Sequence, residues 1–135
     1  MLVRFIEWLN GLISSKADRL DKCEVAAEPP IRFSQMTIVA RSPRNSDVQP
    51  DTFYLVTSSN EPKWAMFLCP CGCGHVITLS LQKVHDPHWR LDKKIEGRPT
   101  LYPSVWQKTP CYSHFWLRGG RIYWCEETGS PSHYR

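Results

Sequence analysis

A run of three cysteines at alternate positions, in the stretch LCPCGCGH at residues 68–75, sets the strongest limit on how this chain folds. In a straight β-strand, Cys69, Cys71 and Cys73 would follow one another at about 6 to 7 Å, because a strand rises about 3.3 Å per residue. Thiolates that share a zinc ion must lie within about 4 Å of one another, since zinc–sulfur bonds are about 2.3 Å long. The run must therefore bend, and Gly72 and Gly74 permit the backbone angles for this.

Zinc explains the cysteine run better than a disulfide, because a disulfide within Cys-x-Cys closes too small a ring to be relaxed. Tetrahedral zinc needs a fourth ligand, which the segment PCYSHFW at residues 110–116 can supply. The preferred ligand set is Cys69, Cys71, Cys73 and Cys111, and either His114 or His75 could replace one of these thiols. Four protein ligands close the coordination sphere, which favours a structural role for the zinc. Cys23 and Cys125 are expected to be small buried apolar residues instead.

The rest of the sequence predicts a mainly β, α+β fold, with a small antiparallel sheet or a partly open barrel that holds the zinc site. Six Trp, five Tyr and five Phe supply apolar area for a core, and eleven Pro favour many short elements. Runs rich in β-branched and aromatic residues predict the strands. These runs are residues 31–40, 52–58, 63–69, 75–81, 88–91, 100–106, 114–118 and 121–125.

The first segment has a different pattern, with apolar residues at helical spacing over about residues 2–20. This pattern predicts one N-terminal amphipathic helix, within a segment that spans residues 1–22. It precedes a zinc-containing β domain over residues 31–125 and a flexible tail over residues 126–135. Polar residues interrupt the apolar run, so it predicts neither a signal peptide nor a membrane span. We therefore expect a cytoplasmic protein with reduced thiols.

The pair Gly119–Gly120 predicts a two-residue hairpin turn, which fixes the register of the strands on either side. Counting outward from the turn, Arg118 lies opposite Arg121, and the pairing continues in both directions. One face of the hairpin then carries apolar residues that suit a core: Phe115, Leu117, Ile122 and Trp124. The other face carries His114, Trp116, Arg118, Arg121, Tyr123 and Cys125. We expect this second face to meet solvent or a ligand.

Four stretches together resemble a family of small bacterial proteins that is catalogued as a domain of unknown function and often mislabelled as ammonia monooxygenase. They are CPCGCG, HWRL, LYPSVW and CYSHFWLRGGRIYW, and the resemblance covers about residues 64–125. In the family pattern a His stands two positions before the first Cys, and another stands before the PS dipeptide. Phe67 and Tyr102 occupy these two positions here.

Members of that family occur in operons that also encode ubiquitin-like proteins with their activating and conjugating enzymes, and such operons are associated with phage defence. The resemblance implies a metal-containing peptidase or an accessory factor that acts on the ubiquitin-like protein. We predict the first, a zinc-stabilised peptidase that processes or deconjugates a ubiquitin-like protein. The implied partners are the ubiquitin-like protein or its conjugates, and further the activating and conjugating enzymes. The mixed charges of the first segment predict no membrane partner, and nucleic acid is a less favoured partner.

A peptidase without a catalytic metal needs a nucleophile and a base within hydrogen-bond reach. Ser104 as nucleophile and His114 as base are the candidates, because both lie in stretches that match the family. Ser113 is the rival nucleophile, although neighbouring side chains on a strand point to opposite faces. Trp106, Trp116 and Tyr123 are expected to line a groove for an extended peptide.

Two non-enzymatic functions compete with this interpretation. Arg118 and Arg121 beside Trp116 and Tyr123 could bind single-stranded nucleic acid. The net charge of +4 is small for such a function, and basic runs are absent. Alternatively, the chain could be a zinc-containing adaptor that recruits a protein partner through its N-terminal helix.

Overall fold

The computed structural model describes residues 28–108 and 111–126, and these residues form nine short strands. The strands are β1 (Met36–Val39), β2 (Phe53–Ser58), β3 (Glu61–Leu68), β4 (Val76–Ser80), β5 (Arg90–Asp92), β6 (Thr100–Tyr102), β7 (Val105–Gln107), β8 (Ser113–Arg118) and β9 (Arg121–Trp124). Within the described residues the only helical element is a single 3₁₀ turn, η1 (Asn45–Asp47). The predicted helix over residues 2–20 and residues 127–135 of the predicted tail lie outside the described residues.

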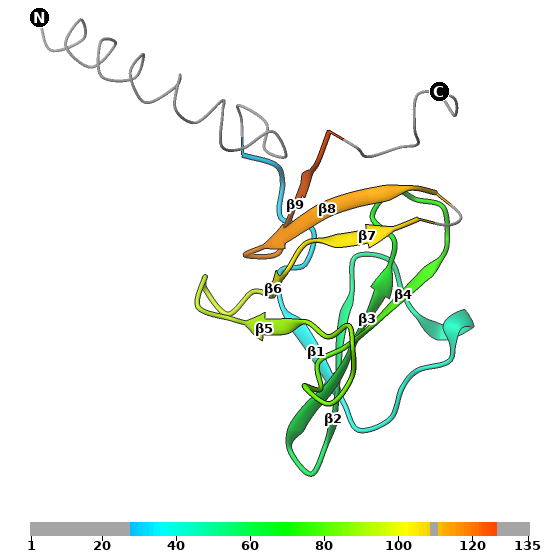
Figure 1. The fold of residues 1–135 in the computed structure, drawn as a ribbon, viewed down its shortest axis with the longest axis vertical. Helices are drawn as coiled ribbons and strands as arrows, with labels where there is room; N and C mark the ends of the chain where they lie inside the picture. Colours follow the sequence, from blue (N-terminus) through cyan, green and yellow to red (C-terminus); the bar gives the residue numbers. More distant parts are fainter. Residues whose placement is uncertain (1–27, 109–110, 127–135) are drawn as a thin grey trace, which may run out of the picture.

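The strands form three small sheets, which Figure 1 shows with β7, β8 and β9 above β3 and β4. One sheet has the order β1-β2-β3-β4, a second pairs β5 with β6, and the third has the order β7-β8-β9. The prediction of a mainly β fold is confirmed, but the described strands form three small sheets and no closed barrel, where one small antiparallel sheet or a partly open barrel was predicted. The β1–β2 pair is parallel, and the predicted strand 100–106 is divided at Pro103, which has no N–H for a ladder.

Four phenylalanines connect the four-stranded sheet with the β7–β8–β9 sheet in the main core. Phe33, Phe53 and Phe67 contact one another at ring-centroid distances of 5.4 to 5.8 Å. Phe67 in β3 also meets Phe115 in β8, edge to face, at 6.4 Å. All four are almost fully buried, so aromatic packing holds β3 against β8. This packing brings the chain after β3 close to the chain before β8.

The β8–β9 hairpin has the predicted turn and the predicted register. Gly119 and Gly120 both have positive φ, at 58° and 78°, which suits a two-residue turn. The Gly120 carbonyl accepts hydrogen bonds from the backbone N–H groups of Arg32 and Phe33, at 2.7 and 2.9 Å. A Cβ at Gly120 would overlap the Phe33 carbonyl oxygen. The turn therefore holds residues 32–33 against the hairpin.

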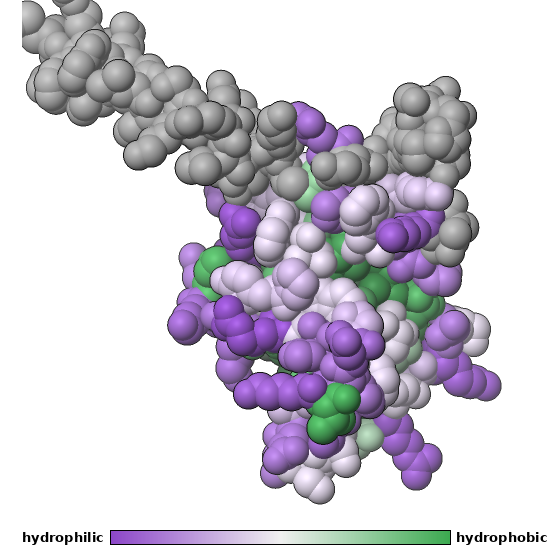
Figure 2. Space-filling view, viewed as in Figure 1, coloured by the Kyte–Doolittle hydropathy of each residue, from purple (hydrophilic) through white to green (hydrophobic). Residues whose placement is uncertain are grey.

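The predicted core face of this hairpin is buried, with Phe115, Leu117 and Ile122 in the core and Trp124 packed against it. The surface seen in Figure 2 is mostly hydrophilic, and its apolar residues form small patches. No helix in the described part of the chain has the length and hydropathy needed to cross a bilayer.

Candidate functional site

The four cysteines of the preferred ligand set come together in the structure. The sulfur atoms of Cys69, Cys71, Cys73 and Cys111 all lie within 4.8 Å of one another. Cys69 Sγ is 3.5 Å from both Cys71 Sγ and Cys111 Sγ. Tetrahedral zinc with bonds of about 2.3 Å separates its sulfurs by about 3.8 Å, so this donor set fits a zinc ion after small side-chain adjustments. The cluster could hold a metal ion.

A tight turn between β3 and β4 brings three of these thiols together. The N–H of Cys69 donates to the carbonyl of His75 at 2.8 Å, and the N–H of Gly72 donates to the carbonyl of Cys69 at 3.1 Å. Gly72 and Gly74 have φ of 91° and 86°, a region that favours glycine. The predicted bend at the glycines is therefore present, and it makes the spacing of the cysteines compatible with one ion.

The predicted alternative ligands lie outside the cluster. His75 is exposed and His114 contacts a serine instead. Cys125 is buried as expected. Cys23 lies outside the described residues.

The surroundings of the thiols shift their pKa values in different directions. Burial raises the pKa of the Cys69 thiol, and burial also raises that of Cys73. At Cys71 burial acts in the same direction, but hydrogen bonds with Ser113 and the neighbouring thiols outweigh it and lower the pKa to about 7. A metal binds thiolates, so one ligand of the cluster is already prepared near neutral pH.

Ser113, the rival nucleophile, belongs to the cysteine cluster. Its side chain is 1% exposed, and its Oγ lies 3.1 Å from Cys111 Sγ and 3.5 Å from Cys69 Sγ. Its neighbour His114 points to the opposite face of β8, as alternation along a strand requires. The hydroxyl of Ser113 is thus placed to hydrogen-bond the thiols of Cys69 and Cys111. In the sequence, only the closeness of Ser113 to Cys111 points to this contact.

Ser104 and His114 meet on the other face of β8. Ser104 Oγ lies 2.9 Å from His114 Nε2, although the two residues belong to separate segments joined by the β7–β8 connection. Both side chains are half-buried, so a substrate can reach them. The ring of Trp106 stacks on the His114 ring, with centroids 4.6 Å apart and planes 7° apart. This stacking restricts the rotation of the imidazole and keeps Nε2 directed at the hydroxyl.

The position of Ser104 is fixed by a residue that sequence reasoning missed. The indole N–H of Trp89 donates to the backbone carbonyl of Ser104 at 3.2 Å. Trp89 packs against the main core cluster, so the nucleophile candidate is connected to the rigid part of the molecule. The stretch HWRL, in which Trp89 lies, was one of the four matching stretches and was the available signal.

A second serine–histidine contact, also missed, joins Ser80 Oγ and His85 Nδ1 at 2.5 Å. Ser80 is buried, and its hydroxyl already accepts the backbone N–H of Gln82 at 3.1 Å. A hydroxyl that closes a local turn in this way has a structural role. Ser104 differs from Ser80 in two ways: it is half-buried where Ser80 is buried, and its hydroxyl accepts no such backbone N–H within the described residues.

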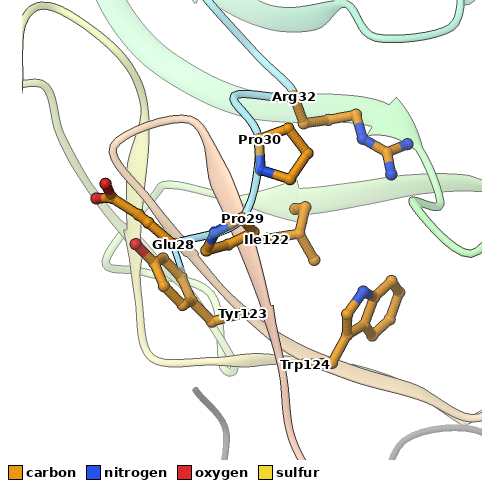
Figure 3. A pocket seen from close by; sticks show the side chains of 7 residues that line it. All are labelled: Glu28, Pro29, Pro30, Arg32, Ile122, Tyr123 and Trp124. Atoms are coloured by element: carbon orange, nitrogen blue, oxygen red, sulfur yellow. The ribbon is translucent and has the colours of Figure 1, made fainter. Parts of the chain in front are cut away.

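Aromatic residues continue from His114 along the same face of the β7–β8–β9 sheet. Trp116 lies opposite Tyr123, and the guanidinium of Arg118 lies 5.5 Å from both ring centroids. A pocket of about 430 Å³ lies at the β9 edge of this sheet. Figure 3 shows its lining, in which Tyr123 lies beside Glu28. Trp106 and Trp116 do not line this pocket, so the three predicted groove residues share a face of the sheet but not a pocket.

Comparison with known proteins identifies the family. Residues 38–125, more than half of the 135-residue chain, match the family described as bacterial ubiquitination-like system serine protease (BubE). No curated protein and no solved structure matched the chain in the corresponding searches. The matched region contains the cysteine cluster and the Ser104–His114 contact. The chain therefore belongs to the BubE family of bacterial ubiquitination-like system serine proteases.

Proposed function

We propose that this protein is a serine peptidase that cleaves a peptide or isopeptide bond formed by a ubiquitin-like protein. Ser104 is the proposed nucleophile and His114 its general base. The observation that carries the proposal is the 2.9 Å contact between Ser104 Oγ and His114 Nε2 on an accessible face of the sheet. A nucleophile and base within about 2.6 to 3.2 Å are the core of serine peptidase chemistry.

The proposed reaction runs through an acyl-enzyme. Ser104 Oγ attacks the carbonyl carbon of the scissile bond while His114 Nε2 takes the hydroxyl proton. The tetrahedral intermediate collapses, the bond to the leaving amine breaks, and His114 returns the proton to that amine. A water molecule then attacks the ester, His114 again takes and returns a proton, and Ser104 is regenerated. Stacking by Trp106 keeps the imidazole oriented through both steps.

A zinc ion held by Cys69, Cys71, Cys73 and Cys111 is proposed as a structural part of the same protein. When bound, zinc would join the β3–β4 turn to the start of β8 by four coordinate bonds. Cys111 lies three residues before His114, so this connection would fix the start of the strand that carries the base.

The biological setting proposed here is a cytoplasmic, ubiquitination-like pathway that acts in phage defence. The peptidase would mature the ubiquitin-like protein or release it from conjugates. Family membership supports a ubiquitin-like partner, since the family is described as belonging to a ubiquitination-like system. The activating and conjugating enzymes of that system are further proposed partners.

Replacing Ser104 by Ala tests the proposal directly. Incubated with a fusion of the ubiquitin-like protein from the same system, Ser104→Ala should cleave at least about a thousandfold more slowly than the unmodified protein. Ser80→Ala is the matched control, because it removes the hydroxyl of the other serine–histidine contact and should retain cleavage. Metal content should be equal in all three proteins.

Full cleavage by Ser104→Ala would exclude Ser104 as the nucleophile. If the unmodified protein binds the ubiquitin-like protein at high salt but cleaves nothing, it is a binding module and the enzymatic proposal is wrong. A fluorophosphonate probe that labels the unmodified protein but not Ser104→Ala would identify the nucleophile independently of the substrate.

A further inference from the structure

The direction of the backbone hydrogen bonds in β8 shows which edge of β7 is available. The N–H of Cys125 donates to the carbonyl of His114 at 2.9 Å, so the backbone of His114 faces β9. In an antiparallel ladder, successive residues direct their N–H and C=O groups alternately to the two neighbouring strands. Ser113 and Phe115 therefore direct their backbone groups toward β7.

The register of β7 against β8 determines where the backbone groups of Trp106 point. Phe115 pairs with Val105 and Ser113 pairs with Gln107, so these two β7 residues form the hydrogen bonds to β8. Trp106 pairs with His114 as the intervening non-hydrogen-bonded pair, in which side chains lie closest. Their ring stacking at 4.6 Å agrees with this assignment. The backbone N–H and C=O of Trp106 consequently point away from β8.

The outer edge of β7 is open at this point within the described part of the chain. β7 is the terminal strand of its sheet, and no described residue forms a backbone hydrogen bond to Trp106. The next outward-facing carbonyl, that of Ser104, is already occupied by the indole N–H of Trp89. The open stretch therefore begins beside the Ser104–His114 contact and runs toward Lys108.

We propose, resting on the function above, that an extended segment of the ubiquitin-like partner pairs with this edge as an added β-strand. Its backbone would exchange hydrogen bonds with the N–H and C=O of Trp106. Two residues of strand span about 6 to 7 Å, so the segment residue opposite Trp106 lies about two positions from the bond that Ser104 attacks. Backbone pairing orients the segment, and the adjacent side chains select it.

The side chains at this edge favour a neutral or acidic segment. The Trp106 side chain is 47% exposed and offers a flat apolar surface. The Lys108 ammonium lies 5.2 Å from the centroid of that ring. No carboxylate in the described residues forms an ion pair with Lys108. An acidic side chain in the bound segment would therefore find a cation.

The test compares Trp106→Pro with Trp106→Ala, both in the full-length Ser104→Ala protein. Both substitutions remove the indole and its stacking on His114, but only proline removes the backbone N–H. Proline is tolerated on an edge strand where the N–H points outward. Binding of the ubiquitin-like protein fused to a short C-terminal extension is measured by calorimetry. Trp106→Pro should bind about fivefold more weakly than Trp106→Ala, the effect of one hydrogen bond.

Val105→Pro and amide exchange complete the test. Val105→Pro should unfold at a much lower temperature than Trp106→Pro, because Val105 bonds to β8. In the free Ser104→Ala protein, the Trp106 amide should exchange with solvent faster than those of Val105 and Gln107. The bound fusion protein should slow it at least tenfold.

Three results would overturn the proposal: equal affinities of the two Trp106 variants, a Trp106 amide that binding leaves unprotected, and no binding of the fusion protein. Because every binding measurement uses a protein without the Ser104 hydroxyl, these results are separate from the cleavage assay. If the protein cleaves nothing but the two Trp106 variants differ in affinity, the edge of β7 is a strand-pairing binding site without peptidase activity. If the protein cleaves the fusion but the two variants bind equally, it is a peptidase that binds its substrate elsewhere.

Discussion

Neighbouring residues at the start of β8 have different surroundings, because successive side chains of a strand point to opposite faces of the sheet. Ser113 is buried with the cysteines, while His114 meets Ser104 on the accessible side. The two residues are adjacent in sequence, and the direction of each side chain decides whether it meets the thiols or the Ser104 hydroxyl. The period of two in a strand supplies that direction.

Trp89→Phe should lower the rate of the chemical step. The substitution removes the N–H that holds the Ser104 carbonyl, while the phenyl ring keeps part of the packing. We expect kcat to fall about three- to tenfold, the effect of about 1 kcal/mol of lost positioning, with KM and metal content little changed. Steady-state cleavage of the fusion protein measures this, and Trp124→Phe, on another part of the core, is the control. An unchanged kcat would show that Trp89 does not position Ser104.

The cysteine cluster could be predicted from sequence, while the Trp89 contact could not. Thiols are ligands that zinc prefers, and the glycines beside them allow the backbone to bend. The residue types and their spacing were therefore enough to predict the cluster of Cys69, Cys71, Cys73 and Cys111. Trp89 acts through a backbone carbonyl, an acceptor that every residue has. The stretch HWRL drew attention to Trp89, but nothing in the sequence indicates which carbonyl its indole N–H would meet.

At the scale of elements, the β8–β9 hairpin is the one whose turn and register could both be predicted from local sequence. A Gly-Gly turn permits one register, and that register assigns every side chain of β8 and β9 to a face. The predicted strand 31–40 is shorter in the structure, where β1 begins at Met36. The reason is tertiary, since residues 32 and 33 bond to the Gly120 carbonyl instead of a neighbouring strand.

Gly120→Ala should destabilise the protein far more than Gly119→Ala. At Gly120 the added methyl meets the fixed carbonyl oxygen of Phe33, and φ is 78°. At Gly119 it meets the Ile95 side chain, which can move. We expect Gly120→Ala to lower the free energy of unfolding by more than about 2 kcal/mol and Gly119→Ala by about 1 kcal/mol. Urea denaturation measures both, and equal losses would contradict the close approach at Gly120.

At the scale of the described molecule, all three small sheets contribute residues to one main hydrophobic core. Alternation along the chain predicted the strands but not their assembly, because the same pattern suits one sheet, a barrel or several sheets. The parallel β1–β2 pair and the edge-to-face contact of Phe67 with Phe115 join residues that lie far apart in the sequence. Only packing of the complete chain determines them.

Metal removal should affect stability and activity together. A metal that binds only the folded protein adds about 4 kcal/mol to its stability when its concentration exceeds Kd about a thousandfold. Treatment with a zinc chelator should therefore lower Tm and stop cleavage, and added zinc should restore both. Thermal denaturation and the cleavage assay are run in parallel.

The double variant Cys71→Ser, Cys73→Ser is the control for this experiment, because it lacks two of the four thiols and should not respond to the chelator. An unmodified protein with the same Tm before and after chelation would show that the cysteines hold no stabilising ion.

The back-to-back placement of the cysteine cluster and the Ser104–His114 contact on β8 limits how this stretch can change during evolution. Adding or deleting a single residue between Cys111 and His114 would turn the imidazole inward and carry the buried hydroxyl outward, so both centres would be lost in one event. Substitutions can accumulate singly in this interval, but we expect length changes to be rejected. Relatives that retain both the cysteine cluster and the serine–histidine contact should therefore keep the same number of residues between Cys111 and His114.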